Sequence, residues 1–272
     1  MDSKILFPPN ELEQLETIFG LRTNVPRDVV IVSFDLEINM DNPMHNRYNQ
    51  ITQIGVSMLD TRKLSGPLNK PLTTKHIIVC CGHKRFTHER AKFHFGSSEH
   101  IVRPQDTDEA IVKLLHIPDE RASGRYRDII LVGHGLRSDL LLLRKRGVLF
   151  EEIKTIAGIL DTTNIAKEVL EINFRLDTLL RFLRYPLKNI HNAGNDANYA
   201  LRAILMLVYH GLRSSCLSLE ATRILSNFKS LALEPIPDTT QRSALHRALK
   251  PRCEDFIFAA LRDDNIDLFH DF

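Results

Sequence analysis

The sequence lacks the features that identify membrane and secreted proteins. Its 272 residues contain no run of 18 apolar residues and no signal-peptide pattern. We therefore expect an intracellular protein, cytoplasmic or nuclear, that has no membrane partner. The cysteines also lack the spacing of a metal site, and in such a compartment we expect them to be reduced thiols. The four cysteines are Cys80, Cys81, Cys216 and Cys253.

A strong charge of either sign is missing as well. The formal net charge is +2, so binding to nucleic acid would have to come from local groups of cations. Neither a glycine-rich phosphate-binding loop nor a nucleophile-elbow sequence is present, which argues against a P-loop nucleotide-binding protein and against a serine hydrolase. The length and the 43% of hydrophobic residues are ordinary for one large globular domain, or for one domain with extensions.

A buried strand followed by two carboxylates is the most informative segment of the chain. Residues 29–34 form an almost unbroken apolar run, as expected for a central strand covered on both faces. Residues i and i+2 of a strand point to the same side, so Asp35 and Glu37 project together. Two like charges beside an apolar strand are costly unless a cation neutralises them, which favours a divalent metal with oxygen ligands. For this segment alone, the alternative is a strand that ends in solvent with an acidic exit.

The rest of the chain alternates between predicted strands and helices. Further strands are predicted at 50–60, 76–81, 127–134 and 156–160, and helices at 105–116, 137–146, 163–170, 175–184, 197–210 and 218–230. Short connections between the first three strands favour an antiparallel meander. A helix is also predicted near residues 10–19, with Asn10 as its N-cap and Glu13 as the capping-box partner.

Three more ionisable residues lie at the ends of apolar elements. Asp139 is in the first turn of the helix after the Gly133–Gly135 turn, just past a predicted central strand, where open α/β sheets place their ligands. Asp196 opens the long apolar helix, and His191 precedes Asp196 by five residues. Four carboxylates and one histidine are thus candidates for a common site.

The order of these residues resembles that of the DEDDh (DnaQ-like) 3′–5′ exonuclease family. The resemblance covers residues 28–212 and consists of Asp-x-Glu on the first strand, an Asp after a Gly-His turn, and His-x-Ala-x-x-Asp near a late helix. Residues 176–197 resemble the third motif and its lead-in helix, and Asp161-Thr162 resembles the Asp-Thr that ends the fifth strand. Residues 132–136 and 92–99 are most similar to a fungal branch of the family.

The resemblance implies a ribonuclease-H-like α/β fold, with a five-stranded mixed sheet whose first three strands are antiparallel and with helices on both faces. It implies a 3′–5′ exonuclease that releases nucleoside 5′-monophosphates with the help of two Mg²⁺ or Mn²⁺ ions. Single-stranded RNA is slightly favoured over DNA, although no contact to a 2′-OH is identified. The implied metal ligands are Asp35, Glu37, Asp139 and Asp196, and His191 is the implied general base.

Substrate contacts are predicted beside these motifs and in one basic segment. Residues 82–96 combine cations with interleaved phenylalanines, a combination typical of single-strand binding, although a loop whose phenylalanines enter the core is the alternative. The residues after the acidic pair could line a pocket for the 3′ nucleotide or form a plain loop, and His134 could support the second motif or cap a helix. The candidate substrate-binding residues are Ile38, Asn39, Lys84, Arg85, Phe93, Phe95 and His134.

Two departures from the family pattern leave a second function open. Ile38 follows the glutamate of the first motif, and Gly135 follows the histidine of the second motif, where family members usually have other residues. These changes keep every predicted metal ligand but alter positions that would contact substrate. The alternative is therefore a catalytically weak or inactive domain that binds RNA or a protein partner.

Segments flank the predicted domain on both sides. We divide the chain into an N-terminal extension at 1–27, an exonuclease-like domain at 28–212 and a helical C-terminal extension at 213–272. The last stretch, 254–272, holds six acidic residues, one arginine and four phenylalanines. It could occlude the site by docking on residues 82–96, mediate a homodimer, or pack as an ordinary terminal helix.

Overall fold

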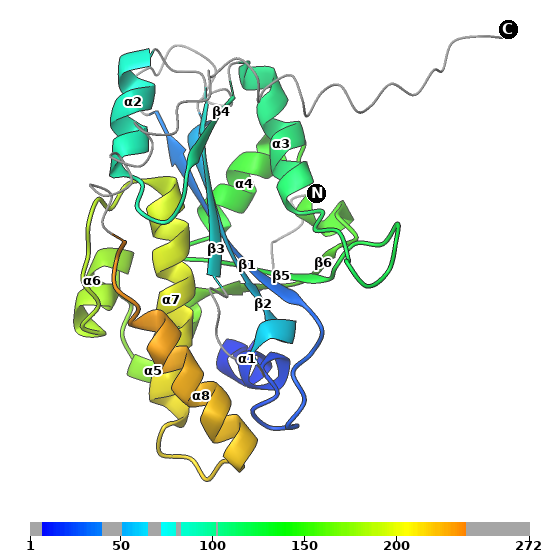
Figure 1. Ribbon diagram of the computed structural model, residues 1–272, viewed down its shortest axis with the longest axis vertical. Coiled ribbons are helices and arrows are strands. Elements are labelled where there is room, and N and C mark those ends of the chain that lie inside the picture. The colour runs from blue at the N-terminus through cyan, green and yellow to red at the C-terminus, as the bar shows by residue number, and fades with distance from the viewer. Residues whose placement is uncertain (1–6, 40–50, 65–71, 80–82, 102, 238–272) are drawn as a thin grey trace, which may run out of the picture. The chain divides into compact units, whose positions relative to one another are not determined.

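A six-stranded mixed sheet forms around the predicted central strand (Figure 1). The strands are β1 Val30–Ile38, β2 Ile51–Asp60, β3 Leu72–Val79, β4 Ser98–Ile101, β5 Ile129–Gly133 and β6 Ile156–Asp161, in the order β4-β3-β2-β1-β5-β6. Strands β1, β2 and β3 are antiparallel, as predicted, while β4 runs parallel to β3, and β5 and β6 run parallel to β1. The predicted ribonuclease-H-like class is confirmed, with one strand more than the sequence predicted.

The computed structural model describes residues 7–39, 51–64, 72–79, 83–101 and 103–237. The predicted roles of 254–272 in occlusion and dimerisation lie outside these residues. Of the four cysteines, Cys216 is the one that falls within them, and it is a free, exposed thiol. Within the same ranges, no helix combines the length and apolar character that a membrane crossing requires.

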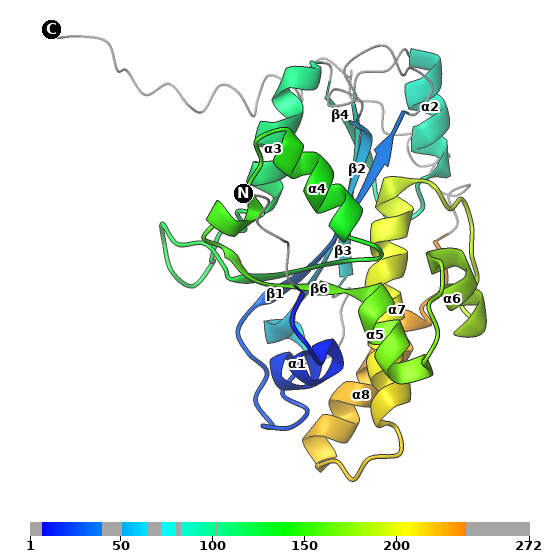
Figure 2. The same ribbon diagram turned by 180° about the vertical axis from the view of Figure 1, so that it is seen from behind.

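Helices cover both faces of the sheet and form two apolar layers. They are α1 Glu11–Ile18, α2 His83–Lys92, α3 Thr107–Leu114, α4 Arg137–Lys145, α5 Thr162–Leu170, α6 Leu176–Phe182, α7 Ala193–Leu212 and α8 Leu219–Ala232. One buried cluster joins the sheet to α1, α5, α6, α7 and α8, and the other joins it to α3 and α4 (Figure 2). The segments predicted as extensions therefore contribute α1 and α8 to the core of the sheet.

The long helix α7 lies against β2 at the point where β2 pairs with the acidic end of β1. Gly55 of β2 is the register partner of Asp35, and a Cβ at Gly55 would collide with the backbone carbonyl of Ala193 in the first turn of α7. The helix begins at Ala193 rather than at the predicted Ala197, and the Asn192 side chain caps it by accepting the Asn195 N–H at 3.2 Å. A glycine in β2 thus brings this helix terminus to the sheet.

Helix α1 is capped from another part of the chain than predicted. Asn10 has φ 58° and makes no side-chain cap bond, so the predicted capping box is wrong. The Glu168 carboxylate of α5 instead accepts the N–H groups of Glu11 and Leu12, each at 2.9 Å. A negative charge at a helix N-terminus is favourable, and here it also ties α1 to α5.

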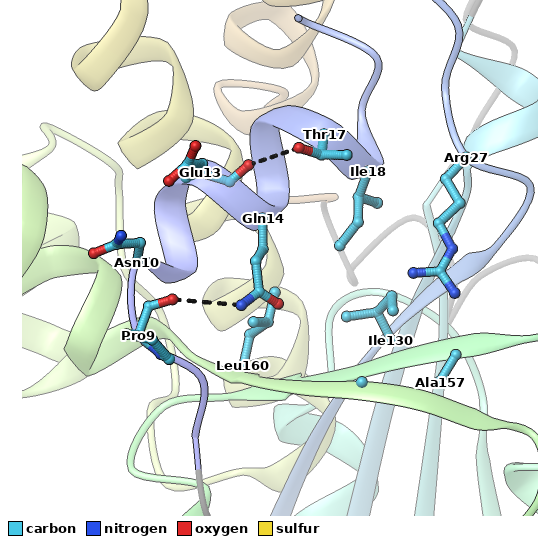
Figure 3. Close-up of a pocket in the computed structure, with 11 residues that line it drawn as sticks. Pro9, Asn10, Glu13, Gln14, Thr17, Ile18, Arg27, Ile130, Ala157 and Leu160 are labelled. Atoms are coloured by element: carbon cyan, nitrogen blue, oxygen red, sulfur yellow. Dashed lines mark hydrogen bonds between the residues drawn. The ribbon is translucent and has the colours of Figure 1, made fainter. Parts of the chain in front are cut away.

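A cavity of about 370 Å³ lies between α1 and the β5–β6 edge of the sheet (Figure 3). Ile18, Ile130 and Leu160 give it apolar walls, and Arg27 lies at one side. The Gln14 side chain crosses it and donates to the Pro9 carbonyl at 3.4 Å. None of the five predicted catalytic residues lines this cavity, so the candidate site lies elsewhere.

Candidate active site

The end of β1 meets the start of α7, and this brings together residues that are far apart in the sequence. The Glu37 Oε1 and His191 Nδ1 atoms are 4.0 Å apart, and one ligand atom each from Glu37, His191 and Asp196 lies within 4.8 Å of the other two. The pairing of β1 with β2 becomes irregular between Glu37 and Ile38, which ends the regular strand at the acidic pair.

The loop before α7 holds His191 in an unusual backbone conformation. Its φ is 61° and that of Asn189 is 49°, in the left-handed region that costs an L-residue about 1–2 kcal/mol. The His191 N–H donates to Asp196 Oδ2 at 2.8 Å, and the Asn195 side-chain amide donates to the Asn189 carbonyl at 3.0 Å and to the Lys92 carbonyl at 2.9 Å. These bonds fix the loop, while the His191 side chain stays 69% exposed and so accessible to substrate.

Asp139 is positioned by the turn between β5 and α4. Gly135 has φ 72° in this turn, a conformation that glycine adopts without strain. The Asp161 carboxylate at the end of β6 accepts the Gly135 N–H at 3.0 Å and the Leu136 N–H at 2.8 Å, and it also accepts the Thr163 N–H at 2.9 Å. Sequence reasoning noted Asp161 through the family resemblance and missed its role in this turn, because Gly135 and Leu136 are 25 or more residues away.

Burial raises the pKa of all four predicted carboxyl groups, and neighbouring carboxylates add to the shifts of Asp35, Asp139 and Asp196. Burial, and then the charges of Asp139, Asp196 and Glu37, raise the pKa of Asp35 well above its usual range. Burial and the Glu37 charge raise the pKa of Asp139 to about 8. Burial raises the pKa of Asp196 to about 7 against the lowering effect of the His191 N–H, and burial also raises the pKa of Glu37. The charges of Asp35 and Asp139 thus interact with those of the other carboxyls, while the measured cluster of ligand atoms joins Glu37, His191 and Asp196. The common site of all four carboxyls stays a prediction.

The donor set at this volume suits hard divalent cations. Within the described ranges, Asp35 Oδ2 and Asp196 Oδ1 are buried and have no hydrogen-bond partner, although buried polar atoms are normally paired. Carboxylate oxygens beside one imidazole are ligands that Mg²⁺ and Mn²⁺ accept. A cation there would satisfy both oxygens and would lower the raised pKa values of the carboxyl groups.

The predicted phenylalanine contacts are corrected by the structure. Phe93 is 3% exposed, with its ring 5.0 Å from that of His76, so the prediction that it stacks on a base is wrong. The Phe95 ring is half-buried, packs edge-on against Tyr199 at 5.6 Å and lies under the Arg202 guanidinium, against the core. Helix α2 ends at Lys92, and the chain after it turns its rings towards α7, which sequence spacing alone did not show.

The other predicted substrate residues have mixed surroundings. Ile38 is 42% exposed beside the acidic pair, Asn39 is half-buried, and Arg85 is exposed on α2. The His134 Nε2 lies 3.0 Å from the Phe174 carbonyl, which ties the second motif to the segment before α6. The side chain of Lys84 lies outside the described residues. These five residues stay predictions.

One comparison with known proteins decides the family. A DEDDh family model, described as DNA polymerase III subunit epsilon-like, C-terminal domain, matches residues 30–207. The chain belongs to the DEDDh family. The match runs from β1 through most of α7, so it includes every candidate catalytic residue of this DEDDh chain. No curated protein matches the chain.

Membership of the DEDDh family confirms the predicted family and suggests a nuclease that acts on nucleic acid with divalent metals. The fungal branch within the family stays a prediction.

Proposed function

We propose that this DEDDh protein is a metal-dependent 3′–5′ exonuclease that releases nucleoside 5′-monophosphates from single-stranded nucleic acid, with RNA slightly favoured over DNA. The observation that supports it best is the pair of buried, unpartnered oxygens, Asp35 Oδ2 and Asp196 Oδ1, among carboxyls with raised pKa values. A purely structural acidic cluster would be expected to pair these oxygens with protein donors.

The carboxylates would hold two ions, Mg²⁺ or Mn²⁺. In this proposal Asp35 would contribute to both sites, together with Glu37 and Asp196 at one and with Asp139 at the other. Such ions, when bound, neutralise charge on the scissile phosphate and increase the acidity of the attacking water. The protein's own part is to fix the four carboxylates on rigid elements, β1, α4 and α7.

His191 would act as the general base. Its Nδ1 is the ring nitrogen near Glu37, which leaves Nε2 to take a proton from the attacking water. The Glu37 carboxylate then lies close enough to stabilise the imidazolium. The exposed ring can meet a phosphodiester that arrives from solvent.

An oligonucleotide panel tests the proposal. Wild-type protein with Mg²⁺ or Mn²⁺ should shorten 5′-labelled single-stranded RNA, and more slowly DNA, from the 3′ end, and chromatography should identify nucleoside 5′-monophosphates. Asp35→Asn should lower the rate at least about 100-fold, because charge stabilisation in the transition state is lost. Asp128→Asn, the same change at an exposed carboxylate before β5, is the matched control and should keep the wild-type rate.

A binding domain without activity is the second candidate. Two positions next to the motifs favour it. Ile38 has an exposed aliphatic side chain, and no neighbouring atom lies near the position that a Cβ at Gly135 would take. If wild type and Asp35→Asn bind oligonucleotides equally but leave the whole panel intact, this second function replaces the exonuclease.

A further inference from the structure

An aromatic pair with one exposed ring lies on and just before α6. Phe182 is 55% exposed, and its ring lies 5.3 Å from that of Phe174 at an interplanar angle of 31°. Phe174 packs against the core, so it supports Phe182 from below. A single exposed phenylalanine is common on protein surfaces, and what distinguishes this one is the charge around it.

The same segment holds four cations, three of which have no ion-pair partner among the residues that the structure describes. Arg175 lies 3.8 Å from Asp177, but for Arg181, Arg184 and Lys188 the described part of the chain offers no ion pair. All four cations are exposed. Helix α6 buries Leu179 and Leu180, so Arg181 and Phe182 lie on its solvent side. These rings and cations lie on one short stretch of the chain, which we call the α6 face: Phe174, Arg175, Arg181, Phe182, Arg184 and Lys188.

Residues of the α6 face contact segments that carry the candidate active site. The Phe174 carbonyl contacts His134 of the second motif at 3.0 Å, and Asp177 of α6 is near enough to Asp196 to act on its carboxyl group. At the other end, the Lys188 carbonyl accepts the Tyr199 hydroxyl of α7 at 2.7 Å, shortly before the chain reaches His191. In both views of the molecule, α6 lies beside α7 (Figures 1 and 2).

We propose that the α6 face is a binding track for single-stranded nucleic acid, on which the strand lies while its 3′ end occupies the carboxylate site. The Phe182 ring would stack on a base, and Arg181, Arg184 and Lys188 would contact successive phosphates, as in other sequence-tolerant single-strand sites. This inference depends on the proposed function and specifies where that function holds its substrate. It replaces the predicted stacking role of Phe93 and Phe95.

Binding without catalysis tests the track. Fluorescence anisotropy of a 5′-labelled 12-nucleotide single-stranded RNA in EDTA reports affinity while hydrolysis is prevented. Phe182→Ala should weaken binding at least about fivefold, or about 1 kcal/mol, with the salt dependence unchanged. Arg181→Gln/Arg184→Gln should lower the slope of log affinity against log salt by about 1.4, since each phosphate contact on a single strand contributes about 0.7.

A matched control is available on the segment that links α3 to β5. Arg125 and Tyr126 also pair an exposed cation with an exposed ring, Tyr126 being 56% exposed, and this segment is remote from α6 in both views (Figures 1 and 2). Arg125→Gln/Tyr126→Ala should bind the RNA as the wild type does. Thermal unfolding of all variants checks that the α6 changes leave the fold intact.

The outcomes separate this inference from the proposed function. Reduced binding by the α6 variants supports the track even if the wild type cleaves nothing, in which case the exonuclease proposal fails alone. In an active enzyme, the α6 variants should lose more rate on the 12-nucleotide RNA than on the p-nitrophenyl ester of thymidine 5′-monophosphate, which is too short for the track. The track is wrong if both α6 variants bind the RNA with wild-type affinity, or if the wild type binds no RNA in about 50 mM salt. An acidic protein partner then becomes the remaining candidate for the α6 face.

Discussion

At the scale of single residues, Asp161 connects parts of the chain that the sequence analysis treated separately. Its carboxylate accepts N–H groups from the turn that begins α4, and its own N–H donates to the buried carboxyl group of Glu11 in α1. Glu11 also accepts the Asn164 side-chain amide. A chain of hydrogen bonds thus runs from α1 through Asp161 to the turn that carries Asp139.

Replacing Asp161 should affect catalysis more than substrate binding. Asp161→Asn keeps the shape but offers one carbonyl oxygen to the N–H groups of Gly135 and Leu136, so the first turn of α4 should shift. We expect kcat to fall about 10- to 100-fold with little change in KM, because small displacements of a catalytic group cost about that much. Steady-state kinetics on the short ester substrate measures both. A variant that loses stability but keeps the wild-type kcat would limit Asp161 to a structural role.

Glu11 should make stability depend on pH. Burial raises the pKa of this carboxyl group to about 7 in the folded protein, although bonds to Asp161 and Asn164 lower it. Between the unfolded pKa, near 4.5, and about 7, the folded state holds a proton that the unfolded chain has lost. Its stabilising contribution is therefore fully present below 4.5 and is lost as the pH rises through 7.

Chemical denaturation in EDTA at several pH values measures this effect. Relative to wild type, Glu11→Gln should gain stability as the pH rises from 4.5 to 7.5, by up to about 3 kcal/mol, because a neutral amide has no proton to lose. Carboxyls at the candidate site titrate in the same direction in both proteins, so the difference between the two curves isolates Glu11. Parallel curves would contradict the raised pKa.

At the scale of elements, the approach of α7 to β2 positions the site. His191 precedes this helix and Asp196 lies in its first turn, and the approach depends on Gly55 having no side chain. A second glycine, Gly194, also approaches the sheet closely, since a Cβ there would lie 2.7 Å from the Cβ of His76 on β3. Helix and sheet are therefore in backbone contact at the point where the candidate catalytic residues meet.

Gly55→Ala should consequently damage both stability and activity. The added methyl group would meet the Ala193 backbone rather than a flexible side chain, so the helix must move. We expect a loss of about 3 kcal/mol in unfolding free energy and a large loss of nuclease activity, measured by denaturation and by the oligonucleotide assay. Gly158→Ala on β6 is the control, because its methyl would meet only the end of the Ile130 side chain at 3.2 Å and should be tolerated.

The elements that sequence reasoning predicted are those with local signals. Strand β1 is an uninterrupted apolar run, and α7 is a long apolar helix, so both were found together with the carboxylates at their ends. Strand β4 was missed because Ser98-Glu-His-Ile101 is short and mostly polar and forms at the sheet edge through its pairing with β3. The cap of α1 and the inward turn of Phe93 depend on Glu168 and α7, which no local pattern reveals.

At the scale of the molecule, one compact unit runs to Ile236 and includes α1 and α8. Helix α8 packs on α7, and the Phe228 ring lies 4.5 Å from that of Phe19 after α1. Arg202 of α7 is buried and donates to the carbonyls of Leu231 and Glu234 at the end of α8, at 2.8 and 2.9 Å. The candidate site therefore depends on a core to which segments outside the predicted 28–212 domain contribute.

Two truncated chains should differ clearly in thermal stability. A chain of residues 1–236 should unfold cooperatively at the wild-type Tm, whereas a chain of residues 1–212 should lose at least 10 °C, about 3–5 kcal/mol, because α8 leaves apolar surface and the Arg202 guanidinium uncovered. Calorimetry measures both. Equal Tm values would show that α8 is dispensable. Higher nuclease activity of the 1–236 chain than of the full chain would support the predicted occlusion by 254–272.

The two carboxylate oxygens of Asp196 have different roles, which should couple the effects of substitutions at Asp196 and His191. Oδ2 holds the backbone of His191 in its left-handed conformation, while Oδ1 is buried without a hydrogen-bond partner and is the oxygen left to bind a metal. Changing Asp196 would therefore remove a ligand and release the general base in one step. Once Asp196→Ala is present, adding His191→Ala should cost almost nothing further. In a double-mutant cycle the effects of the two changes on activity would therefore be strongly non-additive, although five residues separate the two positions.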